Sequence, residues 1–326
     1  MNKNIAIILS GGSGSRFGGP LPKQFTKLAG KAVIEYTIET FESSNKIDEI
    51  FIVSKNEYIE KTWDIINRNN WKKVSKVLVG GKERFDSTYS ALIALRKYSP
   101  ETKVIFHDAV RPLITQKIIH DCIDKLDLFD AVDVVIPSSD TLVEVYDDGC
   151  ISNIPNRNTM RRGQTPQAFK LKTISTAYQM AVEQKRNVFT CDCGVVRSML
   201  PQTRVATIEG SEKNIKITQS LDLFIAEKQL QISERTDIDD RIDLCQLKGK
   251  TLVIFGGSSG IGKSMAEIAK LHNASVYIAS RKYNNVDITN KESIINFLNS
   301  VTQKSNKIDY IVNTVGLLIK KPIDVS

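Results

Sequence analysis

The chain has 326 residues, of which 41% are hydrophobic and 25% charged, a composition that excludes disordered and fibrous proteins. No apolar run reaches the roughly 18 residues of a membrane span, and residues 1–4 lead directly into a short strand, so we expect a cytoplasmic protein without membrane contact. The formal net charge of +8 permits binding to nucleic acid, but the basic residues are scattered and equally suit an enzyme for phosphorylated substrates.

Apolar runs alternate with helical stretches along the first 210 residues. We expect helices that include 33–43 and 87–97, and strands at 5–9, 49–54, 76–79, 103–107, 132–137 and 204–208. This alternation predicts an α/β fold with a mostly parallel, Rossmann-like sheet. Residues 141–153 differ, because alternating residues flank Asp147-Asp148-Gly149, which predicts a hairpin arm outside the main sheet.

A domain boundary is expected near residue 245. Residues 233–248 are polar and acidic, and a new strand at 251–255 then leads into a second glycine-rich loop and a helix. We therefore predict a first domain at 1–245 and a partial second Rossmann domain at 246–326, which is short for a complete dinucleotide-binding domain.

The first glycine-rich loop, 9–25, follows a buried strand and fits no common phosphate-binding pattern. It lacks the Gly-Lys-Ser/Thr of a P-loop, its third glycine comes one position late for a dinucleotide fingerprint, and two prolines prevent an immediate helix. An irregular glycine-rich loop can turn backbone N–H groups toward one phosphate; the alternative is a plain surface turn. The predicted phosphate-binding residues are Gly11, Gly12, Ser13 and Gly14, flanked by the predicted catalytic cations Arg16 and Lys23.

Six motifs in order carry a resemblance to a known family. "GGSGSRFGGPLPKQF" (11–25) resembles the nucleotide loop of the cytidylyltransferases that include 4-diphosphocytidyl-2-C-methylerythritol synthase and CDP-ribitol pyrophosphorylase. The likeness continues through "GGKERFDSTYSAL" (80–92), "HDAVRP" (107–112), "RGQTPQAF" (162–169), "TCDCG" (190–194) and "EGSEKNIKIT" (209–218). It implies transfer of CMP from CTP to a small polyol phosphate, with release of pyrophosphate.

The resemblance also implies roles on the nucleotide side of the site. Gly80, Gly81 and Ser87 would face the cytosine and ribose. Asp108 ends an apolar strand, where α/β sheets bind ligands, and its carboxylate suits Mg²⁺ shared with the triphosphate; the alternative is a helix cap. Lys216 would contact the acceptor phosphate and would also hold the α-phosphate. It would act with Arg16, Lys23 and Mg²⁺ by positioning and charge neutralisation, so no histidine needs a catalytic role.

On the acceptor side, the resemblance implies contacts from both chains of a homodimer. The residues implied to bind the acceptor are Arg111, Thr141, Arg157, Thr165 and Thr190, and the arm 141–157 would reach the partner's site. The family usually has an acid directly after the threonine, whereas this chain has Thr190-Cys191-Asp192. Asp192 is the candidate for that acid, and its role as a metal ligand stays open.

The second glycine-rich loop, 255–264, fits two patterns. Gly257-x4-Gly262-Lys263-Ser264 fits a P-loop, whereas Gly256-x3-Gly260-Ile261-Gly262 resembles the fingerprint of short-chain dehydrogenases/reductases. Arg281 follows the next expected strand, 275–279, and suits the 2′-phosphate of NADP(H). Further residues that resemble the reductase family are Asp287, at its adenine contact, and Asn313, after its fourth strand.

The reductase family's Tyr-x-x-x-Lys pair is missing, so we expect no reductase activity from these 326 residues, although NADPH would bind an intact second domain. A transferase followed by a reductase resembles the bifunctional proteins that make CDP-ribitol for surface polymers, which implies D-ribitol 5-phosphate as acceptor. The alternatives are a methylerythritol 4-phosphate cytidylyltransferase, a nicotinamide-dependent reductase and a nucleic-acid-binding protein. The set of Arg16, Lys23, Asp108 and Lys216 argues against the reductase, and the scattered charge argues against nucleic acid as a partner.

Overall fold

The computed structural model describes residues 2–12, 17, 21–239 and 244–316, and it divides into two compact units, Met1–Glu234 and Arg235–Ser326. The division falls inside helix α7 (Ser220–Asp239).

A seven-stranded sheet forms the centre of the first unit, in the order β11-β7-β10-β6-β1-β4-β5. Its strands are β1 (Asn4–Ser10), β4 (Glu49–Ser54), β5 (Val74–Val79), β6 (Lys103–Asp108), β7 (Ala131–Pro137), β10 (Arg161–Lys170) and β11 (Val205–Glu209). All neighbours pair in parallel except β10, which runs antiparallel to both β6 and β7. The central strands are continuous apolar runs because both faces of the sheet are covered.

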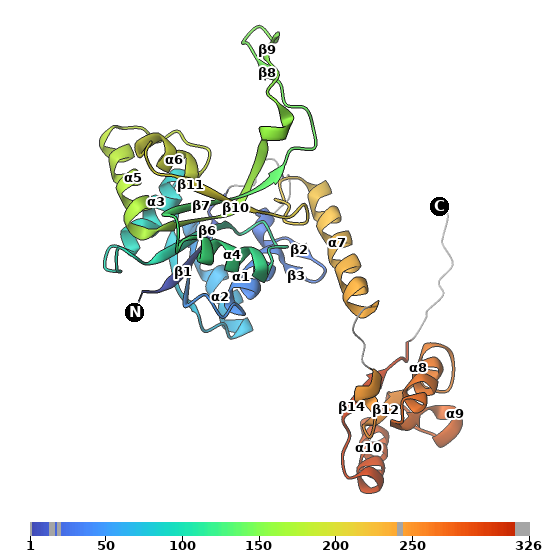
Figure 1. The fold of residues 1–326 in the computed structure, drawn as a ribbon. Helices are drawn as coiled ribbons and strands as arrows, with labels where there is room; N and C mark the ends of the chain where they lie inside the picture. The colour runs from blue at the N-terminus through green and yellow to red at the C-terminus, as the bar shows by residue number, and fades with distance from the viewer. Residues whose placement is uncertain (1, 13–16, 18–20, 240–243, 317–326) are drawn as a thin grey trace, which may run out of the picture. The chain divides into compact units, whose positions relative to one another are not determined.

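Helices cover the two faces in separate groups (Figure 1). The side chains of α1 (Val33–Glu42), α2 (Ile59–Asn69) and α4 (Gln116–Lys125) pack into one apolar core, together with alternate residues of the strands. The side chains of α3 (Arg84–Ala94), α5 (Leu171–Glu183) and α6 (Asp192–Met199) pack into the other. The first unit is therefore a three-layer α/β structure, as the alternation of apolar and helical segments predicted.

Strand β10 is not among the strands that the sequence predicted. Residues 161–167 are polar or contain glycine and proline, and the pairing with β7 is interrupted between Gly163 and Gln167. The strand forms because β6 and β7 offer it two open edges, and its second half carries the buried Ala168 and Phe169. This insertion places Thr165 next to the end of β6.

The predicted hairpin arm is confirmed. Strands β8 (Glu144–Val145) and β9 (Ile151–Asn153) pair antiparallel, and Gly149 at the turn has a φ of +84°. The arm projects away from the sheet of the first unit (Figure 1). Its apolar side chains Val145, Tyr146 and Ile151 are each 58–61% exposed.

The second unit holds a three-stranded parallel sheet in the order β13-β12-β14. Its elements are β12 (Thr251–Phe255), α8 (Gly260–Leu271), β13 (Ser275–Ala279), α9 (Arg281–Asn284), α10 (Lys291–Ser305) and β14 (Tyr310–Asn313). Strands β13 and β14 therefore lie on opposite sides of β12. In parallel sheets, this change of side leaves a crevice at the carboxyl ends of the strands.

Short elements complete the described chain. They are β2 (Lys27–Leu28), β3 (Lys31–Ala32) and the single-turn helices η1 (Lys23–Phe25), η2 (Asn56–Tyr58), η3 (Arg157–Thr159) and η4 (Leu244–Leu247). Within the described ranges, no helix combines the length and the apolar character needed to span a bilayer.

Candidate active site

A polar pocket of about 280 Å³ opens at the carboxyl ends of β1 and β6. Parallel strands run in the same direction, so the loops that follow them lie at this one edge and bring together residues from distant parts of the chain. Six predicted site residues line it: Gly11, Gly12, Lys23, Ser87, Asp108 and Lys216. The predicted residues Ser13, Gly14 and Arg16 lie outside the described residues.

Gly80 and Gly81 lie beside the pocket, not in its lining. A Cβ on Gly80 would come within 2.9 Å of the Ser87 hydroxyl oxygen, and one on Gly81 within 2.1 Å of the Asp86 Cβ. The two glycines are therefore needed for the close approach of the β5–α3 connection to the first turn of α3. Through that contact they set the position of Ser87.

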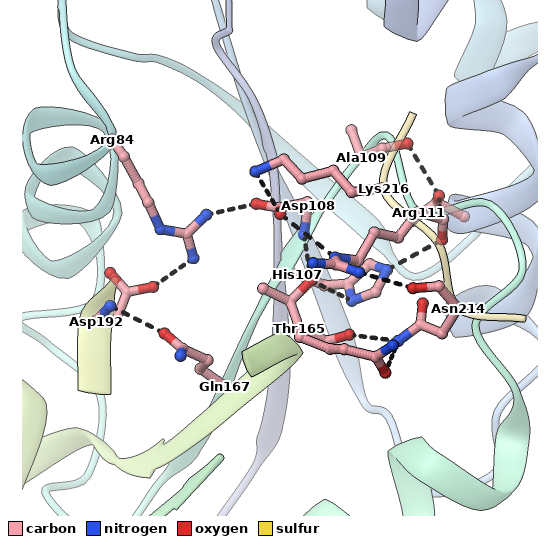
Figure 2. Close-up of polar contacts among 12 residues, drawn as sticks. Arg84, His107, Asp108, Ala109, Arg111, Thr165, Gln167, Asp192, Asn214 and Lys216 are labelled. Carbon is pink, nitrogen blue, oxygen red and sulfur yellow. Dashed lines mark hydrogen bonds and ion pairs between the residues drawn. The ribbon is translucent and has the colours of Figure 1, made fainter. Parts of the chain in front are cut away.

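Asp108 is the centre of the charged groups in the pocket (Figure 2). Its carboxylate pairs with Arg84, lies 3.0 Å from Lys216 Nζ and 3.6 Å from Arg111 Nε, and its side chain is 8% exposed. Burial by itself would raise the pKa of Asp108. The three cations outweigh burial, with Arg84 the strongest, and they hold the pKa of this carboxyl well below its ordinary value.

On its other side, Asp108 is fixed through Thr165 and His107. Nε2 of His107 lies 3.2 Å from the carbonyl oxygen of Arg111, which can only accept, so Nε2 carries the ring proton. Nδ1 then accepts from the Thr165 hydroxyl at 3.1 Å, and the hydroxyl oxygen accepts from the Asp108 N–H at 3.1 Å. Complete burial is the main cause that lowers the pKa of His107 to about 3, so the ring is neutral.

The single hydroxyl proton of Thr165 is therefore used inside the protein, and the residue is 5% exposed. Its contact with the acceptor stays a prediction.

Buried polar contacts also hold the segment that carries Lys216. Arg111 Nη1 donates to the carbonyl oxygen of Asn214 at 2.7 Å, and the Asn214 amide donates to the carbonyl oxygen of Thr165 at 2.8 Å. Asn214 is fully buried. Residues 214–216 are thus attached to β10 and to the loop after β6, which fixes where the Lys216 ammonium enters the pocket.

Arg84 lies within a quoted motif and lines the pocket, but it was not among the predicted site residues. Arg84 Nη2 donates to Asp192 at 2.6 Å, so one guanidinium joins two carboxylates (Figure 2). Gln24 and Lys82 also line the pocket without having been predicted. One sequence offers no signal that separates these side chains from ordinary polar residues at a helix start.

Asp192 is fully buried and does not line the pocket. Its carboxylate accepts from the hydroxyls of Thr88 at 2.9 Å and Tyr178 at 2.7 Å as well as from Arg84. Its oxygens are occupied by protein donors, which argues against a role as a metal ligand. Among the described residues, no group of three or more His, Cys, Asp or Glu side chains could enclose a metal ion.

The predicted acceptor-binding residues fall into two sets. Thr165 and Arg111 lie beside Asp108, as described above. Thr141, Arg157 and Thr190 are exposed and do not line the pocket of their own chain; Arg157 Nη1 donates to the carbonyl oxygen of Ser139 at 3.3 Å, at the base of the arm.

The second unit has a pocket of about 670 Å³ at the carboxyl ends of its strands. Gly256, Gly260, Ile261 and Arg281 line it, whereas Gly262, Asp287 and Asn313 do not. Gly256 has a φ of +82°, and a Cβ on Gly262 would come within 2.5 Å of the Gly256 carbonyl oxygen.

Charged residues near this second pocket distinguish between the P-loop and the dinucleotide-binding interpretations of its glycine-rich loop. Arg281 pairs with Asp287 at 3.0 Å, and both are solvent-accessible. Lys263, which a P-loop would aim at phosphates, does not line this pocket and lies 3.8 Å from Glu267. This geometry favours the dinucleotide interpretation of the loop.

Residues 4–232 of this chain match the protein-family model "IspD: 2-C-methyl-D-erythritol 4-phosphate cytidylyltransferase". The chain is 45% identical over 329 aligned residues to the bifunctional ribulose 5-phosphate reductase/CDP-ribitol pyrophosphorylase Bcs1 of Haemophilus influenzae, covering 99% of this chain and 68% of that protein. It is 37% identical to 2-C-methyl-D-erythritol 4-phosphate cytidylyltransferase of Thermobifida fusca, covering 69% of this chain and 92% of that protein.

Solved structures agree with the sequence comparisons. The 4-diphosphocytidyl-2C-methyl-D-erythritol synthase of Anaerococcus prevotii superposes with a TM-score of 0.62 at 30% identity, covering 71% of this chain and 99% of that one. The family model spans all but the ends of the first unit and includes every residue that lines the pocket described above. The chain therefore belongs to the IspD family of cytidylyltransferases and is a nucleotidyltransferase.

Proposed function

We propose that this protein transfers CMP from CTP to D-ribitol 5-phosphate, giving CDP-ribitol and pyrophosphate. The observation that carries the proposal is the 45% identity to the CDP-ribitol pyrophosphorylase of H. influenzae, which extends over 99% of the chain and so includes the second unit. A second candidate acceptor is 2-C-methyl-D-erythritol 4-phosphate, which the family name and the T. fusca relative favour. That relative aligns over 69% of this chain, whereas the H. influenzae protein aligns over 99%.

The chemistry of the pocket suits nucleotidyl transfer. An oxygen of the acceptor phosphate attacks the α-phosphorus of CTP, a new P–O bond forms, and the bond to the β-phosphate breaks as pyrophosphate leaves. Lys23, in the loop after β1, and Lys216, in residues 214–216, both line the pocket. Their ammonium groups can neutralise the charge that develops on the phosphates. The acceptor phosphate is already ionised, so the reaction needs no strong general base.

The fit of Mg²⁺ rests on one carboxylate. Magnesium in nucleotide sites is commonly held by one or two carboxylates together with phosphate oxygens, and Asp108 is the carboxylate that would hold it here. Lys216 can keep its pair with Asp108 while it binds a CTP phosphate, because an ammonium has three donors. When bound, Mg²⁺ would supply further charge neutralisation of the triphosphate.

The acceptor site is proposed to be completed in a homodimer. Thr141 and Arg157 are the first and last residues of the arm segment 141–157. Both are exposed, and neither lines the pocket of its own chain. The exposed apolar side chains of the arm are suited to packing on a second subunit. Thr141 and Arg157 would then bind the acceptor phosphate in the neighbouring site, opposite Lys216.

The second unit is proposed to bind NADPH at its 670 Å³ pocket, with Arg281 on the 2′-phosphate. The name of the H. influenzae relative joins ribulose 5-phosphate reduction to CDP-ribitol synthesis. Reduction of that ketone yields ribitol 5-phosphate, the acceptor proposed here. The product would serve surface polysaccharide synthesis, such as that of a capsule, from the cytoplasmic side.

The test is pyrophosphate release from CTP with Mg²⁺ and each acceptor in turn. We expect kcat/KM for D-ribitol 5-phosphate to exceed that for 2-C-methyl-D-erythritol 4-phosphate by at least about 10²-fold. A site that hydrogen-bonds the ribitol hydroxyls would reject methylerythritol 4-phosphate, which has one hydroxyl fewer and a branching methyl group. A preference for methylerythritol 4-phosphate would contradict the ribitol assignment and leave the cytidylyltransferase assignment intact.

A further inference from the structure

Arg84 joins the two carboxylates that lie deepest around the nucleotide pocket. It is the first residue of α3, it lines the pocket, and its side chain is 22% exposed. One arm of the guanidinium pairs with Asp108, and the other donates to Asp192 Oδ2 at 2.6 Å (Figure 2). These partners are 24 and 108 positions away in the sequence, so only the folded chain brings them together.

Asp192 does not line the pocket and is connected to it through its ion pair with Arg84. Its side chain is 0% exposed, Thr88 and Tyr178 donate to Oδ1, and its N–H donates to Gln167 at 2.9 Å. A fully buried carboxylate needs a paired cation, because an uncompensated buried charge is strongly destabilising. Arg84 supplies the compensating positive charge. The ion pair with Asp192 in turn fixes the Arg84 guanidinium at the edge of the pocket.

The fixed guanidinium determines the position of Asp108 and, through it, Lys216. Arg84 pairs with Oδ1 of Asp108, so Oδ2 faces Lys216, whose Nζ lies 3.0 Å away, and Arg111, whose Nε lies 3.6 Å away. The result is a row of alternating charges that runs from Asp192 through Arg84 and Asp108 to Lys216. A planar guanidinium holds two carboxylates in a fixed geometry through donors on two sides, whereas an ammonium acts as a point charge and fixes their positions less precisely.

We propose that Arg84 is a positioning residue for nucleotidyl transfer, that Asp192 anchors it, and that this row of ion pairs aims the Lys216 ammonium at the reacting phosphate. The acid of the shifted Thr190-Cys191-Asp192 segment acts through Arg84 and does not bind metal. The proposal rests on transfer from CTP and not on the identity of the acceptor.

The test measures kcat and KM with whichever acceptor the wild-type enzyme prefers, together with the Kd of CTP by calorimetry and the melting temperature. The variants are Arg84→Gln, Arg84→Lys, Asp192→Asn and the double variant Arg84→Gln/Asp192→Asn. Arg68→Gln is the matched control, because Arg68 also pairs with a buried carboxylate, Glu35, at 2.8 Å, but it does not line the nucleotide pocket.

We expect each single change at Arg84 or Asp192 to lower kcat about tenfold or more, because displacement of a reacting group by an ångström is sufficient for such a loss. The Kd of CTP should change less than about threefold. Arg84→Lys should be no better than Arg84→Gln, and the double variant no slower than Arg84→Gln alone, because Asp192 acts only through Arg84. The control should keep wild-type kcat.

Three results would overturn the proposal. The first is a folded Arg84→Gln enzyme with wild-type kcat, and the second is a loss confined to the Kd of CTP. The third is a double variant whose kcat falls by the product of the two single effects, which would make Asp192 independent of Arg84. If a single variant fails to fold because it leaves a buried charge unpaired, the double variant, which removes both charges, decides: wild-type kcat there contradicts the proposal and a tenfold loss supports it.

Discussion

The neutral, buried His107 makes the stability of the first unit depend on pH, and His107→Gln should remove that dependence. Burial, as the main cause, lowers the pKa of His107 from 6.5 to about 3 in the folded state. In the unfolded chain the ring takes up a proton below about pH 6.5. A depressed folded-state pKa means that this stability is fully present above pH 6.5 and is lost as the pH falls toward 3.

The magnitude follows from the difference between the two pKa values. Each pH unit below 6.5 lowers the free energy of unfolding by about 1.4 kcal/mol, so the loss between pH 6.5 and pH 5 is about 2 kcal/mol. Glutamine cannot be protonated in this range, and its amide can still donate to the Arg111 carbonyl oxygen as Nε2 does. The difference in stability between wild type and His107→Gln should therefore shrink by about 2 kcal/mol from pH 7.5 to pH 5.

Urea unfolding followed by tryptophan fluorescence is the assay, because both tryptophans, Trp63 and Trp71, lie in the first unit. Carboxylates titrate in both proteins, so the comparison isolates His107. A stability difference that stays constant from pH 7.5 to pH 5 would refute the reasoning, since it would mean that His107 keeps an ordinary pKa after folding. An NMR titration of the three histidines provides an independent check.

The remaining predictions concern the transferase site. Lys23→Ala should lower turnover on the order of 10²-fold and weaken CTP binding less, as pyrophosphate release and calorimetry would measure; normal turnover would place the developing charge elsewhere. Thr165→Val should lower the free energy of unfolding by about 1–3 kcal/mol, because the Asp108 N–H and His107 Nδ1 lose their shared partner, whereas Thr165→Ser should keep most of the stability in the same urea assay. Equal losses in the two variants would contradict the hydroxyl bridge. Mixing inactive Arg157→Ala and Lys23→Ala chains should restore about a quarter of wild-type activity, because half of the dimers are mixed and each has one intact site. Verified mixed dimers without activity would show that sites are not shared.

The sequence by itself determined the architecture of the central sheet. The apolar runs of β1, β4 and β6 are long enough and continuous enough to be buried on both faces, and the helical segments between them require parallel pairing. The same local order placed Gly11 and Lys23 in the loop that follows β1 and Asp108 at the end of β6, and all three line the pocket. These features depend on the periodicity of neighbouring residues, which one sequence shows directly.

Only the tertiary structure decided the position of β10 and the pairing around Asp108. Residues 161–167 have too few apolar side chains to specify a strand, and they become one because β6 and β7 provide hydrogen-bonding edges on both sides. Arg84 and Asp192 are 108 positions apart, and although both lie in quoted motifs, nothing near either residue indicates that the two pair. Local periodicity specifies which face of an element is buried, but a charge pair inside the protein is specified by burial and distance in the folded chain, which no local pattern contains.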